Sequence, residues 1–132
     1  GLCVYFASSR TLVYAGSRLN LFYSQDKELV LLKGDKQSLG YQSSDPDFPF
    51  QNHVIELKER MVFYLATDGL FDQIGQETGL PLGKRRVRAF LNRIKGKAMQ
   101  EQKQALFEFY ENYQGHEEQR DDLSVLGFCL YP

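Results

Sequence analysis

The chain has 132 residues, 42% of them hydrophobic and 14% aromatic, and its formal net charge is −1 at pH 7. This length allows one domain with a hydrophobic core, and the composition is that of a soluble globular protein rather than a disordered one. The near-neutral charge argues against nucleic acid as a principal partner, because nucleic-acid-binding proteins usually carry a strong basic excess. The apolar runs are too short to span a bilayer, so we expect no membrane contact by this segment.

The first part of the chain predicts a series of short strands. Residues 2–7 and 11–15 are rich in Val and Tyr and flank a polar turn, which is typical of a hairpin. Two further strand-like runs follow and end near Lys33. Because no helical pattern intervenes, the four strands predict an antiparallel sheet. A polar segment, residues 36–52, then leads to a fifth strand over residues 53–57.

The chain is organised around the apolar run Met61–Ala66, which ends in Thr67, Asp68 and Gly69. This pattern predicts a buried strand with one carboxylate, that of Asp68, at its C-terminal end. We expect Gly69 to let the backbone turn sharply there.

A second acidic site lies far downstream, where Asp121 and Asp122 directly precede the last strand-like run, residues 123–130. This run is apolar on both faces and therefore predicts a central strand. Two acidic strand ends suggest one metal centre.

Two helices are predicted between the acidic sites. From residue 84, apolar residues recur at i, i+3, i+4 and i+7, which marks one face of an amphipathic helix. A second helix is expected over about residues 98–113, with Gly115 as its C-terminal cap. Helices that follow a run of strands indicate layering on one face of a sheet. The predicted fold class is α+β: an antiparallel sheet of six or seven strands with two helices on one face.

The first predicted helix is strongly basic. Its cations, which have no acid among them, are Lys84, Arg85, Arg86, Arg88, Arg93, Lys95 and Lys97. Such a patch could attract a phosphorylated or acidic protein. Arg85 and Arg86 are nearest to the Asp68 turn in sequence and are the predicted contacts with a substrate or partner. The alternative is a solvated helix face whose charges pair with the acidic helix that follows.

The segments LATDGLFDQ and RDDLSVLGF together resemble the C-terminal half of the metal-dependent Ser/Thr protein phosphatases, the protein phosphatase 2C (PPM) superfamily. Within that superfamily the bacterial SpoIIE-like branch matches best, and TLVYAGSRLNLFY, SLG and LGKRRVRAFL occupy the places of its strand pair, its PLG motif and a helix opening. The family's first half carries an acid and an Asp-Gly-x-Gly motif that this sequence lacks. We therefore expect residues 1–132 to be the C-terminal portion of one phosphatase domain, without its N-terminal half, and to form part of an α-β-β-α sandwich.

The resemblance implies that the 123–130 strand lies beside the 61–66 strand and brings Asp121 close to Asp68. It also implies that Asp68 and Asp121 are catalytic metal ligands and that Asp122 belongs to the same metal site. Two Mn²⁺ or Mg²⁺ ions would neutralise the phosphoryl oxygens and activate a water molecule, and carboxylates suit these hard ions. The implied activity is hydrolysis of phosphoserine or phosphothreonine on a regulatory protein, for example an anti-sigma-factor antagonist. The enzyme would be a larger cytoplasmic signalling protein with upstream sensor domains, and an upstream segment could anchor it to a membrane.

The isolated fragment is expected to be inactive and to self-associate through its exposed sheet. Two alternatives to an enzyme stay open. One is a catalytically silent phosphatase-fold domain that acts as a regulatory protein-binding scaffold, and the other is a free-standing β-rich interaction module. Both acidic sites could also merely cap turns, where Asp is common.

Overall fold

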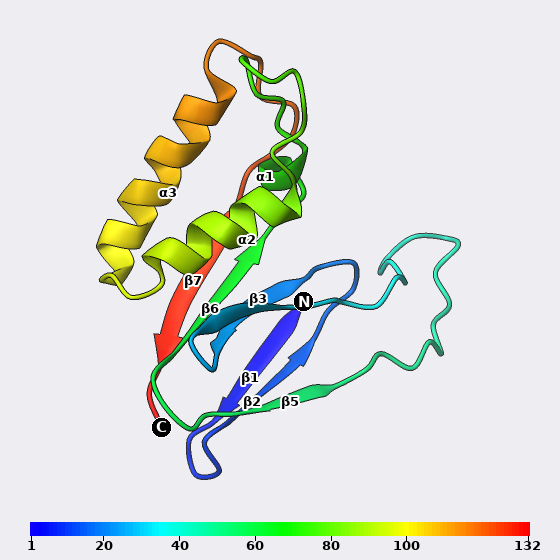
Figure 1. The fold of residues 1–132 in the computed structure, drawn as a ribbon. Helices are drawn as coiled ribbons and strands as arrows, with labels where there is room; N and C mark the ends of the chain where they lie inside the picture. Colours follow the sequence, from blue (N-terminus) through cyan, green and yellow to red (C-terminus); the bar gives the residue numbers. More distant parts are fainter.

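The computed structural model describes residues 1–132 and contains seven strands and three helices (Figure 1). The strands are β1 (Leu2–Phe6), β2 (Thr11–Ala15), β3 (Leu21–Gln25), β4 (Glu28–Leu32), β5 (His53–Glu56), β6 (Met61–Ala66) and β7 (Val125–Leu130). The helices are α1 (Gly69–Asp72), α2 (Gly83–Ile94) and α3 (Met99–Gln114). The α+β class is confirmed, and the predicted strands and helices lie close to their expected limits. None of the helices combines the length and apolarity needed to cross a membrane.

The strands form two sheets instead of the one sheet that the sequence suggested. The three-stranded sheet has the order β1-β2-β5, and the four-stranded sheet has the order β4-β3-β6-β7. Every pairing is antiparallel, as predicted. The chain leaves the first sheet after β2 and enters the second at β3, so the first four strands do not all pair with one another. Side-chain alternation reports which face of a strand is buried, and it carries no information on which sheet the strand joins.

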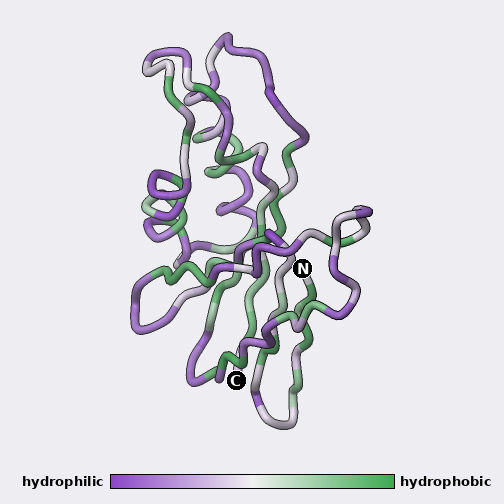
Figure 2. Tube along the Cα trace, turned by 90° about the vertical axis from the view of Figure 1, so that its right-hand side faces the viewer, coloured by the Kyte–Doolittle hydropathy of each residue, from purple (hydrophilic) through white to green (hydrophobic).

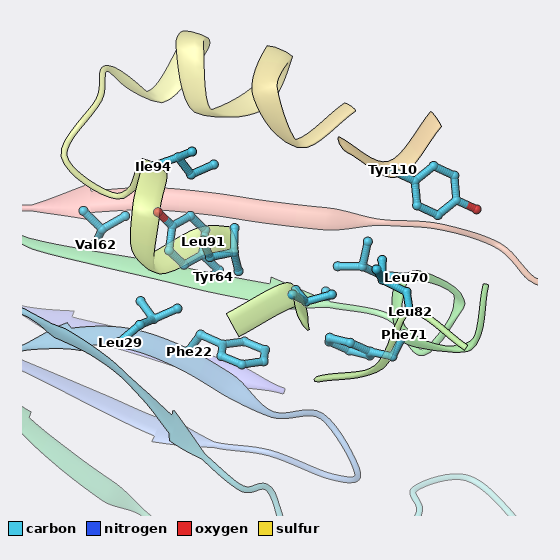
Figure 3. Close-up of a cluster of buried hydrophobic side chains, with 12 residues drawn as sticks. Phe22, Leu29, Val62, Tyr64, Leu70, Phe71, Leu82, Leu91, Ile94 and Tyr110 are labelled. Atoms are coloured by element: carbon cyan, nitrogen blue, oxygen red, sulfur yellow. The ribbon is translucent and has the colours of Figure 1, made fainter. Parts of the chain in front are cut away.

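Two hydrophobic cores lie on the two faces of the four-stranded sheet. The core between the sheets contains Leu12, Tyr14, Leu21, Ile55, Leu57, Met61 and Phe63. The core under the helices contains Phe22, Leu29, Val62, Tyr64, Ala66, Leu70, Phe71, Leu82, Val87, Leu91, Ile94 and Tyr110 (Figure 3). Alternate residues of β6 serve both cores, because successive side chains of a strand point to opposite faces. The resulting layers, helices on sheet on sheet, are three of the four layers of an α-β-β-α sandwich.

β7 lies beside β6, as predicted, but at the edge of the sheet rather than in its centre. The pairing runs from Met61 opposite Leu130 to Ala66 opposite Val125. No strand pairs with the other edge of β7, and Leu126 is 57% exposed. The prediction of a central strand was wrong. An apolar pattern indicates that both faces of a strand are covered, but it does not show whether another strand pairs with each of its two hydrogen-bonding edges.

The outer face of the three-stranded sheet is apolar and uncovered. Leu2, Val4 and Phe6 of β1 are 64%, 38% and 48% exposed, and Val54 of β5 is 68% exposed. They share one face, since Val4 pairs with Val13 and Val13 pairs with Val54. Figure 2 shows the hydrophobic stretches along the strands. This open face carries the predicted surface for self-association.

Candidate functional site

Asp68 lies just beyond the end of a well-buried strand. In β6, all residues except Leu65 are buried, so the strand is fixed by packing on both faces. Asp68 itself is exposed and precedes α1, where its main-chain carbonyl accepts hydrogen bonds from the amides of Phe71 (2.8 Å) and Asp72 (3.0 Å). Its side chain makes no capping hydrogen bond. The Asp68 carboxylate is therefore mounted on a stiff element and free to bind a ligand.

The loop that carries Asp121 and Asp122 is joined to this turn by Thr67. The Thr67 amide donates to the carbonyl of Ser124 (3.0 Å), and the Thr67 hydroxyl donates to the carbonyl of Asp122 (3.0 Å). The Ser124 amide donates in return to the Thr67 hydroxyl oxygen (2.9 Å). These bonds continue the β6–β7 pairing past the ends of both strands. The structure therefore brings the two acidic segments together, as the sequence predicted.

Gly69 has a different role from the one we expected. Its φ angle is not positive, so the turn at this point does not itself require glycine. A Cβ atom at residue 69 would lie 2.5 Å from the carbonyl oxygen of Asp122 and 3.1 Å from that of Asp121. Gly69 is required because the main chain of the second acidic segment packs directly against it.

The three acids present oxygen donors without forming a complete metal site. Asp121 Oδ1 accepts a hydrogen bond from the Asp122 amide (2.7 Å), and the carboxylates of Asp68 and Asp122 accept none from the chain. All three residues are exposed. Carboxylate oxygens suit Mg²⁺ and Mn²⁺, so the donor chemistry fits. The chain contains no group of three or more His, Cys, Asp or Glu residues arranged to hold a metal ion.

Sequence reasoning missed a buried glutamine between the acidic segments. Gln73, at the C-terminal end of α1, is 0% exposed, and its Nε2 donates to the carbonyls of Ile74 (3.0 Å) and Glu118 (3.1 Å). Its Oε1 accepts from the hydroxyl of Tyr110 (2.9 Å), and burial raises the pKa of that hydroxyl. Tyr113, one turn further along α3, is half-buried and packs against the same core. The spacing of four residues from Leu106 was the signal for Tyr110, whereas the sequence carried none for the burial of Gln73.

The first turn of α2 lies close to the Asp68 segment, because α2 packs against α1. The Arg86 guanidinium donates to the carbonyl of Pro81 (3.2 Å) and lies 5.8 Å from the centre of the Tyr113 ring. Arg85 is exposed and makes no hydrogen bond or ion pair with the chain. Both predicted contact residues are exposed and unpaired with acids, and Arg85 is the one with no hydrogen bond to the chain.

Two further cations of α2 contact a carbonyl and a ring rather than acids. Arg88 Nε donates to the carbonyl of Leu29 at 2.7 Å, and Lys84 Nζ lies 5.8 Å from the centre of the Phe71 ring. The single ion pair of the chain joins Lys58 to Glu56, far from this helix in sequence. The alternative expected ion pairs between the basic helix and the acidic helix that follows, and the structure contains none. That part of the alternative is wrong.

A hydrophobic cavity of about 650 Å³ lies between α3 and β7, lined by residues that include Leu106, Phe107 and Leu126. A more polar one of about 610 Å³ lies beside the β3–β4 and β5–β6 turns. Neither cavity is lined by the three candidate acids. The three acids are all exposed, so the acidic site lies on the surface at the end of the sheet.

Comparison with known proteins agrees with this architecture. The family described as "Stage II sporulation protein E (SpoIIE)" matches residues 2–131. The chain is similar to the solved structure "SiaA-PP2C domain of Pseudomonas aeruginosa", with a TM-score of 0.79 and 34% sequence identity. The similarity covers 90% of this chain and 46% of that chain, so the present chain spans about half the length of that relative. A comparison with curated proteins gave no match. From the nearly complete family match and the shared fold, the chain belongs to the SpoIIE family and has a PP2C-like fold.

Proposed function

We propose that this chain supplies one part of the active site of a metal-dependent protein serine/threonine phosphatase. The observation that supports this proposal best is the packing of the Asp121–Asp122 main chain against Gly69, next to Asp68. Asp68 and Asp121 are the proposed metal ligands, and Asp122 is assigned to the same site. The substrate is phosphoserine or phosphothreonine on a regulatory protein, such as an anti-sigma-factor antagonist, within a cytoplasmic signalling pathway.

Hydrolysis of a phosphate monoester is among the slowest uncatalysed reactions in biology, so strong charge stabilisation is needed. Mn²⁺ or Mg²⁺, when bound, neutralises the phosphoryl oxygens and lowers the pKa of a coordinated water. The part of Asp68 is to hold a carboxylate at the end of a rigid strand. The part of Asp121 is to present a second carboxylate whose Oδ1 is oriented by the Asp122 amide.

The remaining ligands are proposed to come from outside these 132 residues. No group of three candidate ligands is present in the chain, and the chain spans only 46% of the similar PP2C-domain chain. In this proposal the chain is the C-terminal portion of one phosphatase domain, and an N-terminal half completes the metal site. Residues 1–132 alone are then inactive as an enzyme.

The basic surface of α2 is the proposed contact for the acidic or phosphorylated protein. Arg85 is free of contacts with the chain, whereas Arg86 is already bound to Pro81. A guanidinium group can bind phosphate or carboxylate with two parallel hydrogen bonds. We therefore assign the first contact to Arg85 and a supporting contact to Arg86.

The test is Mn²⁺-dependent release of phosphate from a phosphoserine protein by the complete protein and two variants. Asp68→Asn removes the proposed ligand, and Asp26→Asn is the matched control. Asp26 lies in the distant β3–β4 turn with a φ of 46°, a conformation that Asn tolerates. Activity should require Mn²⁺, fall by more than about 100-fold in Asp68→Asn, and be retained in Asp26→Asn. A fully active Asp68→Asn protein would refute the assignment.

A second candidate function is a catalytically silent domain that binds a regulatory protein. A basic helix whose charges have no acidic partner in the chain favours it, and an upstream half without acidic ligands would favour it further. It predicts that the complete protein is inactive and indifferent to Mn²⁺ across several phosphoproteins while it still binds an acidic regulator. The same assay, combined with a binding measurement on Arg85→Ala, separates the two candidates.

A further inference from the structure

Gln73 joins three separate parts of the molecule through one buried side chain. The residue ends α1, Tyr110 belongs to α3, and Glu118 belongs to the loop that leads from α3 to β7. The amide uses both of its N–H donors and one of the two acceptor positions of its oxygen, and no buried side-chain polar atom of the chain lacks a partner. Such a fully satisfied buried network specifies one arrangement of the segments that it connects.

A chemically equivalent network lies near the other end of α3. Gln102 is 3% exposed, and its Oε1 accepts a hydrogen bond from the hydroxyl of Tyr64 (2.5 Å). Its Nε2 donates to the carbonyls of Lys95 (3.2 Å) and Lys97 (2.8 Å) in the α2–α3 connection. Each glutamine thus accepts from one tyrosine and donates to two carbonyls. The difference is the loop that is held: the Gln102 network holds a helix connection, and the Gln73 network holds the acidic loop.

We propose that Gln73 is a positioning residue that fixes the Asp121–Asp122 loop against the Asp68 turn. This inference rests on the proposed phosphatase function for its catalytic consequence. Gln73 follows Asp68 by five residues, and Glu118 precedes Asp121 by three. One buried side chain therefore connects the two acidic segments at a short distance along the chain from both proposed ligands.

Other contacts hold the same loop, among them the Thr67 bonds to Asp122 and Ser124 and the bonds between Gln114 at the end of α3 and Glu117. Gln76 Oε1 accepts from the His116 amide (2.7 Å), and Gln119 Nε2 donates to the Asp121 carbonyl (2.8 Å). Both of these glutamines are exposed, so water can replace either bond when it is lost. The Gln73 side chain is itself fully buried and its bond to Tyr110 is buried, whereas its bond to the Glu118 carbonyl is partly buried. Loss of the amide leaves the Glu118 carbonyl without that partner and leaves the Tyr110 hydroxyl without a partner in the core.

The position of the loop matters for a metal site because ligands must be held within about 0.5 Å of the productive geometry. Partners that orient ligands without touching the metal typically change metal affinity or activity by about 10–100-fold when they are removed. We expect a change in that range for Gln73. No such change is expected for Gln102, because the α2–α3 connection carries no proposed ligand.

The experiment compares Gln73→Met and Gln102→Met in the complete protein. Methionine has a similar length and volume and removes the same three hydrogen bonds at each site. Hydrogen exchange should become faster in residues 116–122 of Gln73→Met and stay at the wild-type rate there in Gln102→Met. The Mn²⁺ concentration for half-maximal activity should rise by about 10–100-fold in Gln73→Met alone. Tyr110→Phe and Tyr64→Phe, which keep the donated bonds, should give the same contrast with smaller changes.

The readouts separate the inference from the function on which it rests. Wild-type exchange of residues 116–122 in both Gln73→Met and Tyr110→Phe overturns the role of Gln73 in holding the loop. If the Gln73→Met and Gln102→Met variants lose Mn²⁺ affinity equally, the proposed link between Gln73 and the metal site is overturned. A wild-type protein without Mn²⁺-dependent activity defeats the proposed function and this catalytic link together. In that case, the exchange result still decides whether Gln73 holds the loop.

Discussion

The two sheets have similar apolar strands but are covered differently. The four-stranded sheet has the helices on one face and the three-stranded sheet on the other, so Phe63 of β6 is 0% exposed. The three-stranded sheet is covered only on its inner face, and Val54 of β5 is 68% exposed. The candidate acids are thus attached to the sheet that is fixed from both sides. The other sheet offers a face to which a further segment or a second copy can bind.

The largest expected change in stability comes from removing a side chain in the core between the two sheets. Phe63 stacks on Phe128, with ring centres 5.1 Å apart, and lies in the shared core. Phe63→Ala should lower the free energy of unfolding by about 3–5 kcal/mol. Val54→Ala on the open face should change it by less than about 0.5 kcal/mol. Chemical denaturation measures both, and equal losses would show that the open face is in fact covered.

An intermediate effect is expected for Gly69→Ala, which inserts a methyl group between the two acidic segments. Because its Cβ would meet the Asp122 carbonyl at 2.5 Å, the loop must shift, at a cost of about 1–3 kcal/mol in unfolding free energy. Gly96→Ala is the control, since its Cβ would meet nothing within 4 Å and its φ is not positive. That variant should be unchanged or more stable by up to about 1 kcal/mol. Equal stability of the two variants would contradict the close approach.

Substitutions on the open face of the three-stranded sheet should have the smallest effect on stability. They should have a clear effect on self-association. Residues 1–132 expressed alone should self-associate through this face, and Val54→Lys should reduce the association by placing a charge in it. Leu39→Lys is the control, because Leu39 is 64% exposed but lies in the loop after β4. Sedimentation velocity measures the change. An association that Leu39→Lys weakens as much as Val54→Lys does would place the contact elsewhere.

Local patterns in the sequence were sufficient for the elements but not for their arrangement. The Val- and Tyr-rich composition of residues 11–15 and the spacing from Val87 to Ile94 predicted a strand and a helix that the structure contains. The division into two sheets depends on where the chain crosses between β2 and β3, which is a tertiary property. The edge position of β7 depends likewise on what lies beside the strand.

The site was partly predictable for the same reason. Asp68 and Asp121 stand in recognisable segments at strand ends, and the pairing of β6 with β7 followed from the resemblance to known phosphatases. The roles of Gly69 and Gln73 could not be predicted, because each depends on contact with a segment about 45 residues or more away. Such long-range contacts leave no periodic signal in one sequence.

The most direct measurement is a calorimetric titration of the complete protein with Mn²⁺. The proteins compared are the wild type and the Asp68→Asn, Asp121→Asn and Asp26→Asn variants. If Asp68 and Asp121 ligate one metal centre, each of their variants should bind Mn²⁺ at least about 10-fold more weakly, and Asp26→Asn should bind normally. The variant with both Asp68→Asn and Asp121→Asn should lose less Mn²⁺ binding free energy than the sum of the two single losses, because the two residues share a site. Wild-type Mn²⁺ affinity in both single variants would contradict the assignment of these acids to a metal centre.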